Sequence, residues 1–185
     1  GAHNLIGAFP AVNQRYFHEL ADPGGNGTTT ALTSGDNTHA YSSLVVWEAS
    51  RGGANLTGNN QIERLTMLSG ERLNERFLIN GFTNTDAWHY LRIEAGPGQE
   101  TRGSVDRGAV IQNGTYTSTN HLVYTADVTL VDISWVKNAG SIKCGSAATV
   151  TWTIERCVFG VELGRPVSVG ELTSVTDSVI YRVDS

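Results

Sequence analysis

The chain has 185 residues, of which 39% are hydrophobic, and this is enough to build one sizeable core. Its 21 glycines and 4 prolines, with abundant threonine, serine and asparagine, are typical of short strands joined by tight turns. The net charge of −5 and the scattered basic residues argue against binding to nucleic acid or to an anionic membrane surface. No apolar run approaches the ~18 residues of a membrane-spanning helix.

Residues 1–40 are predicted to form an N-terminal arm rather than a packed domain. Turn-forming residues at positions 22–30 divide this arm from the remainder of the chain. The apolar side chains of residues 1–21 are too irregular to cover a sheet edge and too many to remain in water, so we expect this segment to dock on another chain. Those side chains are Leu5, Ile6, Phe9, Val12 and Phe17.

Residues 41–185 are predicted to form the body of the protein. One amphipathic helix is expected at residues 42–50, where a serine can cap its start and the glycine pair at 52–53 can end it. Beyond it, short runs of alternating apolar residues are separated by glycine, asparagine or proline. These runs predict strands at residues 62–68, 77–82, 89–95, 109–112, 121–124, 128–136, 149–159 and 175–183.

A repeat in the second half of the chain distinguishes between the possible all-β folds. Residues 128–135, 152–159 and 173–180 align without gaps at offsets of 24 and 21 residues, close to one coil of a β-solenoid. By the period-two rule of strands, aligned side chains fall into inward and outward ladders. The inward ladders are Leu130, Ile154 and Val175, and Trp135, Phe159 and Ile180; the outward ladder consists of the hydroxyls of Thr129, Thr153 and Ser174.

Two residues are expected to turn a corner in the middle of each aligned segment, and the second of them is Asp132, Arg156 or Asp177. Stacked ~4.8 Å apart, the order acid, base, acid is mutually attractive, whereas like charges would repel. An exposed network of this kind contributes little to stability. We interpret these three residues as a structural corner ladder rather than as catalytic groups.

These features resemble right-handed parallel β-helix proteins, the pectate-lyase-like superfamily that includes bacteriophage tailspikes and other virion surface proteins. The resemblance rests on the three coils, on the expected helix, and on the run Asp-Pro-Gly-Gly-Asn-Gly at residues 22–27, which is followed by Tyr-Ser-Ser-Leu at 41–44 and Trp-Glu-Ala at 47–49. The insertion between residues 27 and 41 departs from the family's tighter spacing. The resemblance covers about residues 22–185 and implies an all-β, right-handed parallel β-helix with a short N-terminal capping helix. The extended N-terminal arm is predicted from the residues, because residues 1–21 have no counterpart in the family.

This fold hosts lyases, hydrolases, adhesins and inert spikes, so its function must be read from particular residues. A hydrolytic pair of Asp132 and Asp177 would lie ~9.6 Å apart with Arg156 between them, and that guanidinium would lower the pKa of both carboxyl groups. GxSxG, HExxH, Walker and dinucleotide motifs are absent, and Cys144 and Cys157 match no zinc or redox pattern. We therefore expect no catalytic residue, cofactor or metal.

Candidate contacts for a surface glycan surround the turn at residues 96–98, and they are Trp88, His89, Glu94, Asp106 and Arg107. Trp88 is the candidate sugar-stacking platform, because the patterns assign the other three tryptophans to the interior or to the helix interface. Ordinary solvated loop charges are the alternative interpretation of this set.

Taken with the resemblance, these features lead us to expect a non-enzymatic structural protein of a phage or phage-like virion, as a capsid decoration, spike or fibre segment. Its location would be the virion or the extracellular space. The expected partners are further copies of the chain, as a trimer in this family, other virion proteins through residues 1–21, and surface glycans. The alternatives are a polysaccharide-degrading β-helix enzyme, or a fragment of one, and a secreted adhesin module.

Overall fold

The computed structural model places a large part of the predicted body and a short part of the predicted arm. The residues that it describes are 15–21, 41, 44–67, 72–74, 78–79, 81–82, 84–104, 107–113, 121–123, 126–137, 142–144, 150–162, 167–169 and 173–183.

The described residues form short strands and two short helices. The helices are α1 (Leu44–Arg51) and α2 (Leu56–Asn59). The strands are β1 (Arg15–Ala21), β2 (Gln61–Met67), β3 (Arg72–Asn74), β4 (Leu78–Ile79), β5 (Leu91–Ala95), β6 (Val110–Asn113), β7 (His121–Val123), β8 (Val128–Val131), β9 (Ser134–Lys137), β10 (Ile142–Cys144), β11 (Trp152–Glu155), β12 (Val158–Glu162), β13 (Val167–Val169), β14 (Thr173–Thr176) and β15 (Val179–Val183). Neither described helix is long and apolar enough to cross a membrane.

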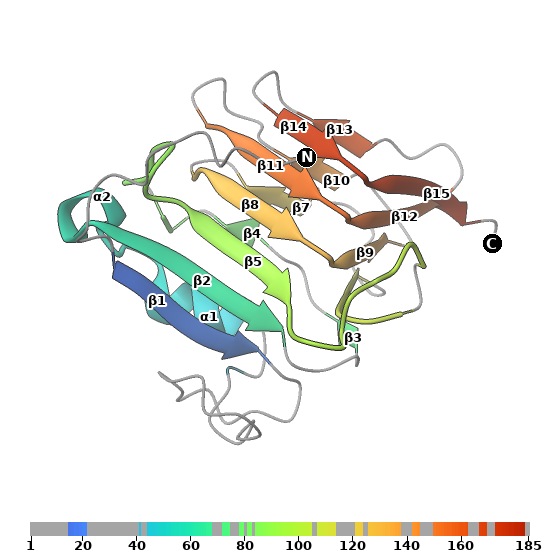
Figure 1. Ribbon diagram of the computed structural model, residues 1–185, viewed down its shortest axis with the longest axis horizontal. Helices are drawn as coiled ribbons and strands as arrows, with labels where there is room; N and C mark the ends of the chain where they lie inside the picture. The colour runs from blue at the N-terminus through green and yellow to red at the C-terminus, as the bar shows by residue number, and fades with distance from the viewer. Residues whose placement is uncertain are drawn as a thin grey trace, which may run out of the picture.

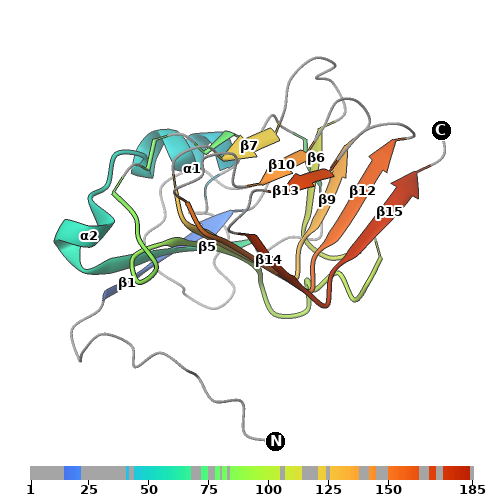
Figure 2. The same cartoon turned by 90° about the horizontal axis from the view of Figure 1, so that it is seen from above.

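The strands assemble into three parallel sheets that the chain visits in a fixed order. The first sheet has the order β1-β2-β5-β8-β11-β14, the second β15-β12-β9-β6-β3 and the third β13-β10-β7-β4. From β2 onward the chain passes from the first sheet to the second and then to the third, and each such passage is called a round below. Figure 1 shows the first sheet face-on, and Figure 2 shows the sheets on different sides of the molecule. The prediction of a mainly β chain with few helices is confirmed.

The predicted repeat is confirmed in its pairing and its register. The strands β8, β11 and β14 are parallel neighbours, and their pairing aligns Leu130 with Ile154 and Ile154 with Val175. The strands β9, β12 and β15 are likewise parallel, and they align Trp135 with Phe159. The rings of these two residues stack with their centroids 6.5 Å apart.

The interior ladder of the first sheet is buried except at its last rung. Leu65, Ile93, Leu130 and Ile154 lie in register and have no exposed surface. The prediction that Val175 is buried with them is wrong, because 48% of this residue is exposed. Val175 lies on β14, the edge strand of the sheet, and among the described strands β11 is its one neighbour in the ladder.

The rounds begin earlier in the chain than the sequence repeat indicated. The strands β2 and β5 already belong to the first sheet, and β3 and β6 to the second. In the round of β5, residues 96–109 separate the first-sheet strand from the second-sheet strand, whereas only residues 68–71 separate β2 from β3. The spacing along the sequence is therefore regular only over the last three rounds.

Helix α1 packs at the end of the molecule where the first sheet begins. It spans Leu44–Arg51, close to the predicted residues 42–50, and Figure 1 shows it behind β1 and β2. Its buried residues are Leu44 and Trp47, and the indole of Trp47 stacks on Phe82 at 5.4 Å. The next two valines lie on the opposite side of the helix, and Val45 and Val46 are exposed.

A buried carboxylate joins α1 to the first round. Glu63 of β2 has no exposed surface, and it aligns with the interior residue Leu91 of β5. It accepts two hydrogen bonds of 3.0 Å from Arg51 of α1, one of 3.0 Å from Gln61 and one of 3.4 Å from the Trp47 indole. A buried carboxylate is costly unless it is paired and hydrogen-bonded, and these four contacts meet that need.

Part of the predicted arm belongs to the protein's own sheet. Residues 15–21 form β1, which pairs in parallel with β2 over all seven residues. The expectation that residues 1–21 contact only another chain is therefore wrong for this part, which includes Phe17. A strand can satisfy its backbone groups on the open edge of β2, which the spacing of apolar side chains does not reveal. The other predicted docking residues lie outside the described part of the chain: Leu5, Ile6, Phe9 and Val12.

Two substitutions on the interior ladder are expected to differ strongly in effect. Ile154→Asp buries a charge between aliphatic neighbours and should abolish the cooperative fold, a loss above about 4 kcal/mol. Val175→Asp makes the same chemical change on a half-exposed rung and should retain the fold. Urea denaturation followed by circular dichroism measures both. Equal losses would contradict the open last rung.

Removing one partner of the buried ion pair should be costly. Arg51→Met leaves the Glu63 carboxylate buried with fewer donors, and we expect the free energy of unfolding to fall by about 3 kcal/mol. The double variant Arg51→Met with Glu63→Met removes both charges and should recover much of the loss. Thermal and urea denaturation of the two variants checks this, and a double variant less stable than the single one would count against the pairing.

Candidate functional site

The predicted corner residues share one backbone conformation. Asp132, Arg156 and Asp177 have φ values of 57°, 51° and 49°, in the left-handed region that ordinary residues rarely adopt. Each lies between a first-sheet strand and a second-sheet strand, after β8, β11 or β14. The corner has the predicted two residues but is shifted by one position, because Val131 and Glu155 still belong to their strands while Ile133 and Cys157 lie before the next strands begin.

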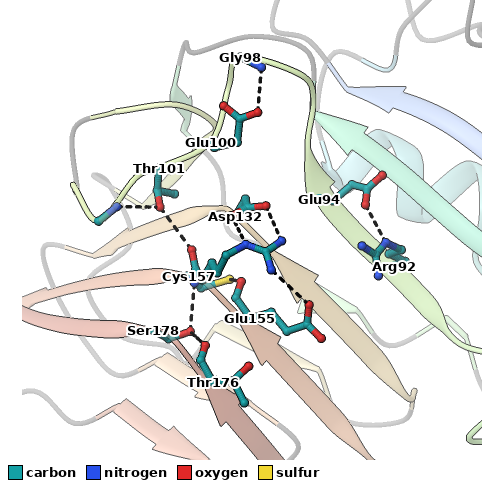
Figure 3. A network of polar contacts seen from close by, with 12 residues as sticks. Arg92, Glu94, Gly98, Glu100, Thr101, Asp132, Glu155, Cys157, Thr176 and Ser178 are labelled. Carbon is teal, nitrogen blue, oxygen red and sulfur yellow. Dashed lines mark hydrogen bonds and ion pairs between the residues drawn. The ribbon is translucent and has the colours of Figure 1, made fainter. Parts of the chain in front are cut away.

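The central rung of the corner is a two-point ion pair. Arg156 donates from Nε to Oδ1 of Asp132 at 2.8 Å and from Nη2 to Oδ2 at 2.7 Å (Figure 3). The hydrogen bonds to Asp132 raise the pKa of the Arg156 guanidinium above its ordinary value. Glu155 lies 3.7 Å from the same guanidinium. Asp177 occupies the next corner and is exposed.

The loop of residues 96–104 packs across this corner. The backbone N–H of Thr101 donates to the carbonyl of Asp132 at 3.2 Å, and its hydroxyl donates to the carbonyl of Arg156 at 3.3 Å. Thr101 has no exposed surface. Glu100 accepts a 3.0 Å bond from the Gly98 amide, and backbone amides hold the pKa of this carboxyl below its usual value. The loop therefore satisfies backbone groups that the left-handed corners turn outward.

Cys157 lies directly behind the corner and is a buried free thiol. Burial raises the pKa of this thiol to about 12. Its Sγ donates to the carbonyl of Glu155 at 3.3 Å, and its backbone N–H donates to Ser178 at 3.0 Å (Figure 3). A thiol with this pKa carries very little thiolate near neutral pH, so it is unsuited to act as a nucleophile.

Glu94 occupies a buried position rather than the predicted surface position. Its side chain is 8% exposed and lies between Arg64 and Arg92. It accepts a 2.6 Å bond from Nε of Arg92, and Arg64 bonds to its other oxygen. The two arginines align on neighbouring strands, so the carboxylate separates like charges that would otherwise repel.

The predicted glycan contacts divide between the two ends of β5. Trp88 and His89 precede this strand, whereas Glu94 lies near its end and Arg107 lies on the loop that follows. A five-residue strand is roughly 16 Å long, so one small ligand cannot touch both groups. Arg107 is exposed, and Asp106 lies outside the described residues.

The turn before β5 is held together by Asp86. Its Oδ1 accepts 2.8 Å bonds from the amides of Trp88 and His89 and lies 2.8 Å from Nδ1 of His89. Burial, the largest single influence, raises the pKa of Asp86, but the hydrogen bonds from Trp88 and His89 outweigh it and hold that pKa below the usual value. The Nε2 of His89 lies 3.0 Å from Oδ1 of Asn60. Trp88 is 44% exposed on this braced turn.

The sequence did not indicate a role for Asp127, which fixes the start of β8 next to this turn. Asp127 is 6% exposed, and its Oδ2 accepts a 2.8 Å bond from the hydroxyl of Thr85. Its Oδ1 accepts a 2.6 Å bond from the amide of Thr151 in the following round. A lone aspartate before a strand has no motif, so only the fold reveals its partners.

An open groove lies on the outer face of the first sheet beside this turn. Its volume is about 260 Å³, and we call it the β5–β11 groove. Its lining residues are Asp86, Ala87, Tyr90, Arg92, Asp127, Val128, Thr129, Thr151, Thr153 and Glu155. Two further hollows, of about 290 and 360 Å³, border the corner and share Glu100 and Asp132.

Carboxylates at and near the corner are paired with arginines. Asp132 is engaged by Arg156 and Glu94 by two arginines, and the carboxyl of Glu100 lies 3.6 Å from Arg102. General acid catalysis by a carboxyl group needs a raised pKa, which a neighbouring guanidinium opposes. Within the described ranges, no group of three or more histidine, cysteine, aspartate or glutamate residues could hold a metal ion.

Comparison with known proteins finds no relative. No family model matches the chain, and neither the curated proteins nor the solved structures contain a match. The interpretation of this protein therefore depends on its residues and their geometry.

The left-handed corner should tolerate some residues and reject others. Asp177→Val places a β-branched side chain at a φ of 49° and should lower the free energy of unfolding by about 1–2 kcal/mol. Asp177→Asn keeps the shape and tolerates this conformation, so it should change stability by less than about 0.5 kcal/mol. Urea denaturation compares the two, and a neutral Asp177→Val would contradict the corner geometry.

Proposed function

We propose that the chain is a right-handed parallel β-helix that serves as a non-enzymatic structural protein of a phage or phage-like virion, as a capsid decoration, spike or fibre segment. The fixed order of three parallel sheets supports the helical winding. About 98% of parallel crossover connections are right-handed, which supports the hand. The repeated left-handed corner and the α1 cap support the same fold.

The observation that carries the structural role is the use of the corner charges. Asp132, the buried Glu94 and their arginines bind one another across successive coils, so they stabilise the scaffold instead of facing a substrate. The ion pairs make this a rigid surface whose charges are bound to one another. It favours a scaffold or spike over the alternative of a polysaccharide-degrading enzyme.

The proposed assembly is a homo-oligomer, with a trimer suggested by the phage proteins that the sequence resembles. The half-exposed Val175 at the edge of the first sheet supports a further partner, because it leaves an apolar rung and a strand edge open. The part of the arm before β1 would contact other virion proteins. The proposed location is the virion or the extracellular space.

The enzymatic alternative is tested with the purified chain and a panel of acidic and neutral polysaccharides. Absorbance of an unsaturated product detects a lyase, and a reducing-end assay detects a hydrolase. We expect no product above that of the Asp132→Asn variant, which loses one of the paired carboxylates. Product that forms with the parent chain and disappears in this variant would overturn the non-enzymatic proposal.

The virion role is tested with an antibody against the chain and density-purified particles from the source. We expect the chain to sediment with the particles at a fixed ratio, and light scattering at micromolar concentration to give the mass of an oligomer. A chain found only in the soluble fraction, together with a monomeric mass, would overturn this role.

A further inference from the structure

We propose that the β5–β11 groove, with Trp88 beside it, binds a neutral sugar chain. This inference deepens the proposed function, because it assigns a ligand class and a place on the surface to a spike or fibre. It depends on three observations: a braced turn that presents an indole, a ladder of outward hydroxyls, and the balance of charge along the groove.

The backbone of the turn that carries Trp88 is held in place before any ligand arrives. Asp86 and His89 exchange two backbone hydrogen bonds, of 2.9 and 3.2 Å, which leaves only Ala87 and Trp88 between them. The carboxylate of Asp86 adds its bonds to the amides of Trp88 and His89, and the His89 ring contacts Asn60. A pre-organised aromatic residue loses little freedom on binding, which favours affinity.

An exposed indole ring can stack on the apolar face of a ligand, while polar groups near the ring bind the hydroxyls of the same ligand. Trp88 is 44% exposed, whereas the other three tryptophans are at most 1% exposed, so it is the tryptophan that a ligand can reach from solvent. Ala87, its neighbour in the turn, lines the β5–β11 groove. A sugar has a C–H face that suits an indole and a rim of hydroxyls that suits the groove.

The floor of the groove carries hydroxyls at a regular spacing. Thr129 of β8 and Thr153 of β11 are paired residues on neighbouring strands, ~4.8 Å apart. They alternate with buried residues along each strand, so their side chains face outward into the groove that they line. Thr151 is exposed at the entry of β11 and extends the series. Hydroxyl groups both donate and accept, as sugar hydroxyls do.

The charges along the groove select a neutral chain over an acidic one. Its lining includes three carboxylates, Asp86, Asp127 and Glu155, and one guanidinium, Arg92. Arg92 already donates to Glu94 at 2.6 Å. A polyanion would meet net negative charge here. Asp127 is nearly buried and already accepts from Thr85 and Thr151, so the acceptors for the hydroxyls of a neutral sugar are the more exposed carboxylates of Asp86 and Glu155.

The experiment measures binding of neutral hexasaccharides, namely maltohexaose, cellohexaose and mannohexaose, and of acidic hexagalacturonate to the full chain. Isothermal titration gives affinity, and acrylamide quenching reports protection of Trp88, because the buried tryptophans are shielded. We expect at least one neutral ligand to bind weakly, since the groove is small and open, and to protect the fluorescence. Hexagalacturonate should not bind.

Three variants connect the binding to the groove. Trp88→Ala should weaken binding at least tenfold, and Thr153→Val, which keeps the shape and removes the hydroxyl, should weaken it severalfold. Val45→Ala truncates another exposed apolar side chain, on α1 and outside the groove lining, so it serves as the matched control and should bind like the parent chain. Circular dichroism spectra must coincide for all three, so that a loss of binding is not a loss of fold.

Each other outcome overturns the proposal. Tighter binding of hexagalacturonate would reject the charge argument, and neutral binding that survives Trp88→Ala would place the ligand elsewhere. Binding of none of the four ligands would reject the sugar site itself. The particle and light-scattering results are independent of these measurements, so failure of the sugar site is distinguishable from failure of the virion role.

Discussion

The structure depends on the parallel backbone ladder that joins each first-sheet strand to the same strand of the next round. Hydrogen bonds hold Leu130, Ile154 and Val175 in one register, and this register determines which side chains stack. An outward residue in one round is therefore outward in every round, which aligns Thr129 with Thr153 and brings Arg156 next to Asp132. Core, corner and groove are three consequences of the same pairing.

The beginning of the ladder shows how the interior accommodates charge. The position that is leucine, valine and tryptophan in later rounds is Glu63 in β2. β2 lies between β1 and β5 in the sheet, and at this position the donors of Arg51, Gln61 and the Trp47 indole surround the carboxylate in place of apolar neighbours. The Glu63 carboxylate thus links α1 to β2. An apolar residue of similar size at this position would remove the link, and it would also remove the free-energy cost of a buried charge.

The sequence allowed the last rounds to be predicted, because residues 128–180 keep a nearly constant spacing and a clean alternation. It did not reveal the earlier rounds, because their spacing is uneven: loop 96–104 and its neighbours lengthen the round of β5 but not the round of β2. Among the candidate site residues, Trp88 is exposed as expected, but Glu94 is buried, since the partner that buries it, Arg64, comes from another round. Contacts between rounds are long-range in sequence, so local patterns cannot report them. For the same reason β1 was not foreseen as a strand.

The cap network has a consequence for the order of events during synthesis. All four donors to Glu63 lie within residues 47–61, so this buried site can be completed before β5 leaves the ribosome. Each later first-sheet strand can then pair with the strand of the round before it as soon as it is made. Growth can therefore proceed vectorially from the α1 end, one round at a time, with the edges of the most recent round, one in each sheet, exposed to other nascent chains.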